Sequence, residues 1–118
     1  MNKAKLTVGI VSCNRKYYLK SLIESLKQTV DQDIELIVID NASTEIGLRD
    51  YLIKEKFISR LIMNKVRKPK TEHMTALNQI VKEAKTEYLL ILSDDIQFIR
   101  KNWITDSLFI LEKYDEIN

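Results

Sequence analysis

Two adjacent carboxylates, Asp94 and Asp95, directly follow a run of apolar residues and are the strongest candidates for chemistry in the sequence. Adjacent carboxylates repel each other unless a cation or hydrogen-bond donors balance their charge. Hard oxygen ligands of this kind suit Mg²⁺ or Mn²⁺, which commonly keep bound water and take substrate phosphates as further ligands. The pair therefore predicts a site for a divalent metal and a diphosphate. The same pair could equally cap the turn that leads into the last helix.

Polar residues also follow the three earlier apolar runs. They are Asn14-Arg15 after the first run, Asp40-Asn41-Ala42-Ser43-Thr44 after the second, and Asn64 with a basic loop after the third. Taken alone, Asp40 is more typical of a turn former, because neighbouring polar side chains can hydrogen-bond to the loop backbone. These positions matter only if the fold brings them together.

The apolar runs have the length of buried strands and alternate with segments of helical spacing. The runs are Leu6–Cys13, Ile34–Ile39, Phe57–Met63 and Tyr88–Leu92, and the helical segments include residues 19–26, 48–52, 74–84 and 104–111. Near-continuous apolar strands alternating with amphipathic helices favour a parallel sheet covered on both faces. We predict an α/β fold with a three-layer, doubly wound and mostly parallel sheet, and with right-handed crossovers.

In such a sheet the ligand lies at the carboxyl ends of the strands, near the point where the winding direction reverses. We assume the strand order 3-2-1-4, in which the first strand lies between the second and the fourth. Asp40 and the Asp94-Asp95 pair would then face one crevice across the Asn14-Arg15 turn. This order makes one site out of scattered motifs.

The composition limits the classes of protein and of partner. A chain of 118 residues, 45% of them hydrophobic, fits one domain over residues 1–118. The net charge of +2 gives no reason to expect a nucleic-acid partner. The single cysteine, Cys13, excludes an intramolecular disulfide, and we expect a cytoplasmic location. No apolar stretch has the roughly 18 residues that a membrane span needs.

Several segments in this order carry a family resemblance. TVGIVSCNR, LIVIDNAST and TEYLLILSDDIQF, with the spacing from Asn64 to Asn78 and with Trp103, resemble the N-terminal half of family 2 glycosyltransferases of the GT-A fold. The resemblance covers the chain from about Leu6 to Trp103. It implies binding of a nucleoside-diphosphate sugar, with UDP-sugar as the guessed donor, and transfer of the sugar to an unknown acceptor.

The resemblance also implies a nucleobase pocket at the ends of the first two strands. It assigns Asp40 to uracil or another base, with Asn14 and Arg15 lining the same pocket. Asn41 and Ser43 would shape the wall of that pocket.

By the same resemblance, Ser93-Asp94-Asp95 after the fourth strand carry the family's D-x-D element. Asp95 would bind Mg²⁺ or Mn²⁺, and Asp94 would contact the ribose or the metal. Ser93 stands where many members have a first Asp, so the site has one carboxylate fewer.

The loop before the third helix departs from the family because it contains no glycine. Its basic residues could reach a diphosphate or could simply be solvated; they are Lys65, Arg67, Lys68 and Lys70. The only histidine, His73, is more typical of a surface or capping residue, and we assign it no role.

The family's catalytic base and acceptor surface come from a second half, whereas this chain ends about two dozen residues after Asp95. We therefore name no catalytic residue and expect the complete transferase site to be absent. Three explanations stay open. The chain is part of a longer enzyme, or another copy or partner supplies the acceptor half, or it is a non-catalytic nucleotide-sugar-binding or oligomerising module.

Overall fold

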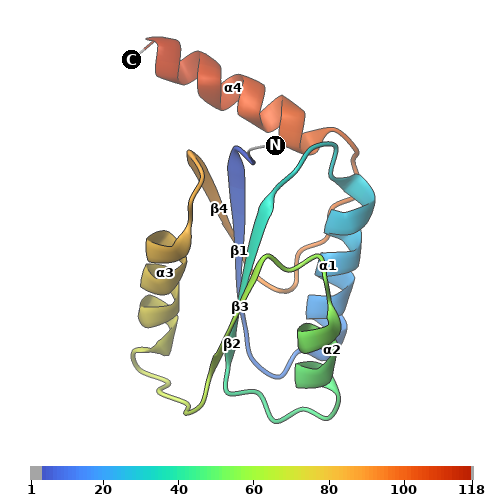
Figure 1. Cartoon of the computed structure of the whole chain (residues 1–118), viewed down its shortest axis with the longest axis vertical. Coiled ribbons are helices and arrows are strands. Elements are labelled where there is room, and N and C mark those ends of the chain that lie inside the picture. The colour runs from blue at the N-terminus through green and yellow to red at the C-terminus, as the bar shows by residue number, and fades with distance from the viewer. Residues whose placement is uncertain (1–3, 118) are drawn as a thin grey trace.

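The computed structural model describes residues 4–117, and the side chains of residues 4–114. Strands and helices alternate along the chain (Figure 1). In order they are β1 (Leu6–Ser12), α1 (Lys16–Thr29), β2 (Glu35–Asn41), α2 (Leu48–Lys54), β3 (Arg60–Asn64), α3 (Glu72–Glu83), β4 (Tyr88–Leu92) and α4 (Trp103–Ile117).

The four strands form one parallel sheet in the order β3-β2-β1-β4, which confirms the predicted fold and strand order. The register pairs Ser12 with Asp40, and Asn41 with Asn64. All four strands point the same way, so their carboxyl ends lie along one edge of the sheet. The winding reverses between β1 and β4, which places the predicted crevice at the ends of β1, β2 and β4.

Helices cover both faces of the sheet, with α1 and α2 on one face and α3 on the other (Figure 1). Alternate residues of β1 and β2 supply the two interfaces, because successive side chains of a strand point to opposite faces. Val8, Ile10, Leu36 and Val38 belong to the large core cluster with α1, α2 and the start of α4, whereas Ile37 and Ile39 pack with α3. Strand β2 is thus buried on both faces.

Gly9 lets α3 approach the centre of the sheet closely. A Cβ atom at this position would lie 2.6 Å from Cγ2 of Ile80, a side chain of α3 that is itself fully buried. A residue larger than glycine would require α3 or Ile80 to move. The sequence therefore uses glycine here for helix-to-sheet packing.

Two element boundaries differ from the sequence prediction. Strand β3 begins at Arg60, although the apolar run begins at Phe57. The reason is a turn, in which the Phe57 backbone N–H donates to the Glu55 carboxylate and Ser59 N donates to Leu36 O. Phe57 contributes to the large core from this turn. Strand β2 extends through Asn41, so Asp40 lies inside the sheet and not in the following loop.

Helix α4 crosses the end of the sheet opposite the carboxyl ends of the strands (Figure 1). The segment before it is tied to α1, because Phe98 N donates to Ser25 Oγ and Trp103 Nε1 donates to Thr29 Oγ1. Phe98 and Trp103 stack with a centroid distance of 4.2 Å. Within the described part of the chain, no helix combines the length and the apolar character needed to cross a bilayer.

Candidate functional site

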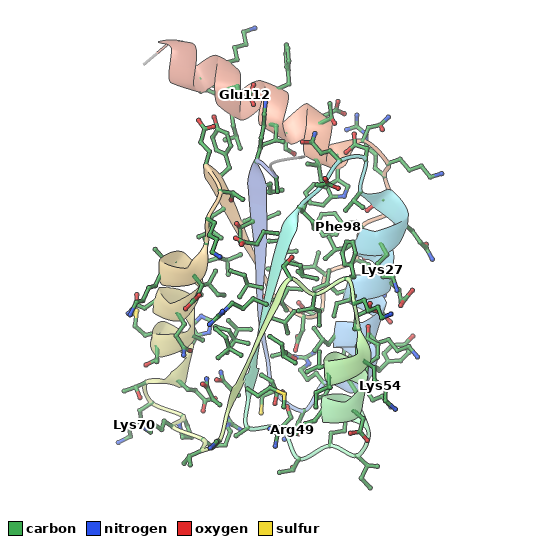
Figure 2. All side chains as sticks on the ribbon, viewed as in Figure 1. Lys27, Arg49, Lys54, Lys70, Phe98 and Glu112 are labelled. Carbon is green, nitrogen blue, oxygen red and sulfur yellow. The ribbon has the colours of Figure 1, made fainter. Side chains whose placement is uncertain are left out.

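A cleft of about 600 Å³ opens at the carboxyl ends of β1 and β4, beside the first turns of α3. In Figure 2 the labelled side chains of Arg49 and Lys70 lie toward this end of the molecule, and Glu112 of α4 lies at the opposite end. The cleft is lined by Val11, Ser12, Cys13, Arg15, Asn41, Glu72, His73, Leu77, Ile91, Leu92, Ser93, Asp94 and Asp95. The structure thus brings the ends of β1, β2 and β4 together around one hollow.

Asp94 is held in place by two neighbours from the β1 side. Its side chain is nearly buried, with 7% of the residue exposed. Ser12 Oγ donates to one carboxylate oxygen at 2.8 Å, and Arg15 Nε lies 3.5 Å from the other. The Ser12 hydroxyl and the Arg15 guanidinium group thus face the negative charge of Asp94 from the β1 side. At the cleft wall, the negative charge of Asp94 is therefore compensated by Ser12 and Arg15.

The guanidinium group of Arg15 contacts both an aromatic ring and Asp94. Its guanidinium group lies over the ring of Tyr18, 4.6 Å from the ring centroid, while its Nε faces Asp94. A cation over an aromatic face is favoured electrostatically, so the two contacts restrict where this long side chain can point. The side chain is still 47% exposed and lines the cleft. A positive charge is thus presented to any anion in the cleft.

Asp95 differs from its neighbour. It is exposed and lines the cleft, and its carboxylate makes no hydrogen bond or ion pair with the side chains and backbone of the described residues. The free oxygen ligand of the Asp94-Asp95 pair is therefore Asp95. Within residues 4–114, no group of three or more His, Cys, Asp and Glu side chains is arranged to hold a metal ion.

Asp40 lies beside the cleft without lining it. It is fully buried, and it accepts hydrogen bonds from the backbone N–H of Ser43 at 3.2 Å and from the hydroxyl of Ser43. It is not among the residues that line the cleft. In this structure its carboxylate closes the turn after β2, which was the alternative that the sequence left open.

Asn14 and Ser43 join the β1 and β2 loops. Asn14 N donates to Ser43 Oγ at 2.8 Å, and Asn14 Oδ1 accepts hydrogen bonds from the backbone N–H groups of Thr44 and Glu45 at 2.6 and 2.8 Å. Asn14 has a φ of 53°, a left-handed conformation that asparagine tolerates better than most residues. The structure brings Arg15, Asn41, Asp94 and Asp95 to the cleft and places Asn14, Asp40 and Ser43 in the loop network beside it.

Sequence reasoning missed Ser12 and Glu72 as cleft residues. Ser12 lay within the apolar run Leu6–Cys13, and only the pairing of β1 with β4 places its hydroxyl on Asp94. Glu72 begins α3, and its carboxylate accepts hydrogen bonds from Arg67 Nε at 2.9 Å and Lys68 N at 2.8 Å. These bonds, led by the one from Arg67, lower the pKa of Glu72. Arg67, one of the basic loop residues, is therefore paired with Glu72.

A second and smaller hollow of about 360 Å³ adjoins the cleft, since Asn41 and Glu72 line both. Two more residues of the basic loop, Lys65 and Lys68, line this second hollow. The diphosphate contact predicted for the basic loop stays a prediction. The exposed side chain of His73 also lines the cleft, a position that no pattern in the sequence indicated.

The comparisons with known proteins agree with this geometry. The sequence matches the model of the family described as glycosyl transferase family 2 over residues 7–117. No curated protein sequence gives a significant match.

Solved structures with a similar fold include TarS 1–349 from S. aureus, with a TM-score of 0.75 and 20% identity over 92% of this chain and 32% of that chain. The same protein in complex with UDP-GlcNAc gives a TM-score of 0.70 and 22% identity over 92% and 31% of the two chains. Mannosyltransferase PcManGT from Pyrobaculum calidifontis, in complex with GDP-Man and Mn²⁺, gives a TM-score of 0.71 and 19% identity over 91% of this chain and 32% of that chain. These similarities support the fold, and this chain spans about a third of the length of those proteins.

Proposed function

We propose, because this chain belongs to glycosyl transferase family 2, that it forms the nucleotide-binding part of a glycosyltransferase. The donor is a nucleoside-diphosphate sugar that binds in the cleft together with Mg²⁺ or Mn²⁺. The observation that carries this proposal is the free carboxylate of Asp95, in the cleft beside the compensated Asp94 and the cation of Arg15. The similar structures that contain UDP-GlcNAc, or GDP-Man with Mn²⁺, support it.

The residues present fit a metal that arrives with the donor. Mg²⁺ in phosphate-handling sites is commonly bound by one or two carboxylates, with phosphate oxygens and water as the other ligands. Asp95 supplies one free carboxylate, and Asp94 directly precedes it on the same segment. The chemistry that such a cation supplies is stabilisation of the negative charge on the departing nucleoside diphosphate.

In this proposal, Arg15 supplies the positive charge that binds the diphosphate. Its guanidinium group carries a permanent charge and can donate two hydrogen bonds to phosphate oxygens at once. Asp94 and Tyr18 orient it at the cleft wall. We assign Arg15 to the diphosphate and Asp94 to the positioning of Arg15. The ribose or metal contact predicted for Asp94 stays a prediction.

Asn14, Asp40 and Ser43 act on the donor through the loops that they hold. Their hydrogen bonds join the β1 and β2 loops that border the cleft. The Asp40 carboxylate is fully buried and already accepts two hydrogen bonds from Ser43. We therefore propose that these three residues fix the position of the loops, while Asn41, which lines the cleft, contacts the donor.

A non-catalytic role is the second candidate, and one observation favours it. Among the described residues, the carboxylates that line the cleft are those of Glu72, Asp94 and Asp95. Glu72 is paired with Arg67 and Asp94 with Arg15, which leaves Asp95 for the metal and no other carboxylate as the acceptor's base. The acceptor, a partner or second copy that completes the site, and the cytoplasmic location all stay predictions.

Release of the nucleotide separates the two candidates. UDP-GlcNAc and GDP-Man would each be incubated with the chain and Mn²⁺, and release of UDP or GDP measured for the wild type and Asp95→Asn. Asp31→Asn is the matched control, because Asp31 is exposed and precedes the opposite, amino end of β2.

The transferase is supported if the wild type and Asp31→Asn release UDP or GDP and Asp95→Asn does not. Binding of the donor without release supports the non-catalytic module. No binding of either donor by folded wild type contradicts the donor site.

A further inference from the structure

Strand β4 is an edge strand of the sheet. Among the described residues it pairs with β1 alone, so one row of its backbone groups lies along a free edge. Natural proteins usually protect such an edge with charged residues, proline or a bulge. The other edge strand, β3, begins with Arg60, whose side chain forms an ion pair with Glu83. Strand β4, with the sequence YLLIL, contains no charged residue and no proline.

The backbone groups on this free edge belong to Leu89 and Ile91. Tyr88 N donates to the carbonyl oxygen of Lys5, which directly precedes β1, so the backbone groups of Tyr88 point toward β1. Successive residues of a strand direct their N–H and C=O groups to alternate edges, and Leu89 and Ile91 therefore direct theirs outward. Their apolar side chains are also exposed, by 37% and 39%.

Two copies of this edge are complementary to each other. A two-fold axis that brings the same edge of two copies together makes the two strands antiparallel. With Leu90 opposite its own equivalent, Leu89 of each copy lies opposite Ile91 of the other. Residues whose backbone groups face each other in this way exchange both hydrogen bonds. This register therefore uses the outward N–H and C=O groups of both residues and pairs their exposed side chains.

The charges beyond the two ends of β4 fit the same register. Lys85 precedes the strand by three residues, and Asp95 follows it by three. Both are exposed, and neither side chain has a hydrogen bond or an ion pair within the described part of the chain. In the antiparallel arrangement, Lys85 of each copy reaches the end of β4 that carries Asp95 of the other. Opposite charges thus meet at both ends of the contact.

We propose that two copies of the chain associate through β4, with Leu90 at the two-fold axis, and form one continuous sheet. The contact extends to the cleft, because Ile91 and Asp95 line it. Leu89 and Lys85 of the partner copy lie beside these two residues, so each cleft is bordered by residues of both copies. This inference goes beyond the proposed function and does not rest on it, because the contact needs no nucleotide.

The first experiment uses the wild type alone. Sedimentation equilibrium at protein concentrations up to about 1 mM should show a dimer. Amide hydrogen exchange followed by NMR should show that the amides of Leu89 and Ile91 are protected in this dimer. A monomer throughout the range, or a dimer in which these two amides exchange freely, would overturn the inference. A monomer in which they are protected would show that another segment of the chain covers β4, and would overturn it as well.

Substitution at the centre of the contact provides the second test. Leu89→Lys places a charge between the two copies and should weaken dimerisation roughly tenfold or more. Ile53→Lys is the matched control, because Ile53 is also apolar and exposed but lies on α2. Sedimentation should show the control to be as dimeric as the wild type. Equal dimerisation of folded Leu89→Lys and Ile53→Lys would refute the contact through β4.

Exchanging the charges at the ends of β4 tests the register. Lys85→Glu would bring two carboxylates together at each end and should weaken dimerisation by roughly fivefold or more. Adding Asp95→Lys to this variant restores opposite charges and should restore dimerisation. The readout is the mass of the protein, so a change in nucleotide binding does not affect it. A double variant that dimerises no better than Lys85→Glu would show that the two residues do not meet.

Discussion

Ser12, the last residue of β1, donates a hydrogen bond of 2.8 Å to Asp94, which follows β4 by two residues. The bond joins the central strand of the sheet to the segment that carries both candidate carboxylates. It exists because β1 and β4 are neighbours in the sheet and end at the same edge. Fixing Asp94 in this way also limits where the next residue, Asp95, can stand.

Removing the Ser12 hydroxyl should destabilise the protein measurably. Ser12→Ala leaves the nearly buried Asp94 carboxylate without one of its two partners, and an unsatisfied buried group costs about 1–3 kcal/mol. The free energy of unfolding would be measured by urea denaturation. Ser107→Ala, at an exposed position of α4, should change it by less than about 0.5 kcal/mol. Equal effects of the two substitutions would show that the bond to Asp94 contributes nothing.

Two substitutions of Asn14 should differ in a predictable order. Asn14→Ala loses the acceptor for Thr44 N and Glu45 N and also places alanine at a φ of 53°, a conformation that costs L-residues about 1–2 kcal/mol. Asn14→Gly loses the same bonds but tolerates the backbone conformation. Thermal denaturation should therefore rank wild type above Asn14→Gly, and Asn14→Gly above Asn14→Ala. The reverse order of the two variants would refute the account of this turn.

Gly9→Ala should destabilise the protein through its contact with α3. The new methyl group would lie 2.6 Å from Cγ2 and 2.9 Å from Cδ1 of Ile80, and overpacking of this kind costs about 1–3 kcal/mol. Ile80→Ala removes both atoms, so Gly9→Ala should cost less in that background. A double-mutant cycle of urea unfolding should give a coupling of about 0.5–3 kcal/mol. Additive effects would place the strain elsewhere.

Stability should fall in acid partly through Glu55. Burial acts to raise the pKa of Glu55, but the hydrogen bonds from Phe57 N and Lys27 outweigh it and hold the pKa below the ordinary value of 4.5. A carboxyl group with a lowered folded pKa contributes stability above its unfolded pKa and loses it as the pH falls through the folded value. The wild type should lose this contribution as the pH falls from about 5.

Glu55→Gln should show a shallower decline in unfolding free energy over the same acid range, measured by urea denaturation at a series of pH values. Glu87→Gln, at an exposed position, should follow the wild type. A decline in Glu55→Gln as steep as that of the wild type would mean that other carboxylates carry the acid dependence.

The sequence was sufficient for the fold because its signals are local. Apolar runs such as LIVID and helical spacing in the segments between them determine the elements, whereas the strand order was an assumption that the structure confirms. The one boundary that shifted most, the start of β3, depends on the turn held by Glu55 and on the pairing of Ser59 N with Leu36 O. Such contacts have no signature in periodicity.

The site was less predictable than the fold, because two side chains of the same type can have different contacts and therefore different roles. Asp94 and Asp95 are chemically identical, and only the position of Ser12 and Arg15 decides which carboxylate is compensated and which is free. The nucleobase role that the resemblance implies for Asp40 stays a prediction, and the backbone turn at Ala42, with a φ of 54°, lets Ser43 donate hydrogen bonds to its carboxylate.

The most direct test of the donor site is calorimetric titration with UDP, with and without Mn²⁺, for wild type, Asp95→Asn and the control Asp31→Asn. Metal and nucleotide that share a site should strengthen each other's binding, typically by roughly 5- to 150-fold. We predict that Mn²⁺ strengthens UDP binding by this amount in the wild type and in Asp31→Asn, and that Asp95→Asn loses the gain. UDP binding that is unaffected by Mn²⁺ in the wild type, or a gain that survives in Asp95→Asn, would contradict the assignment of the metal to Asp95.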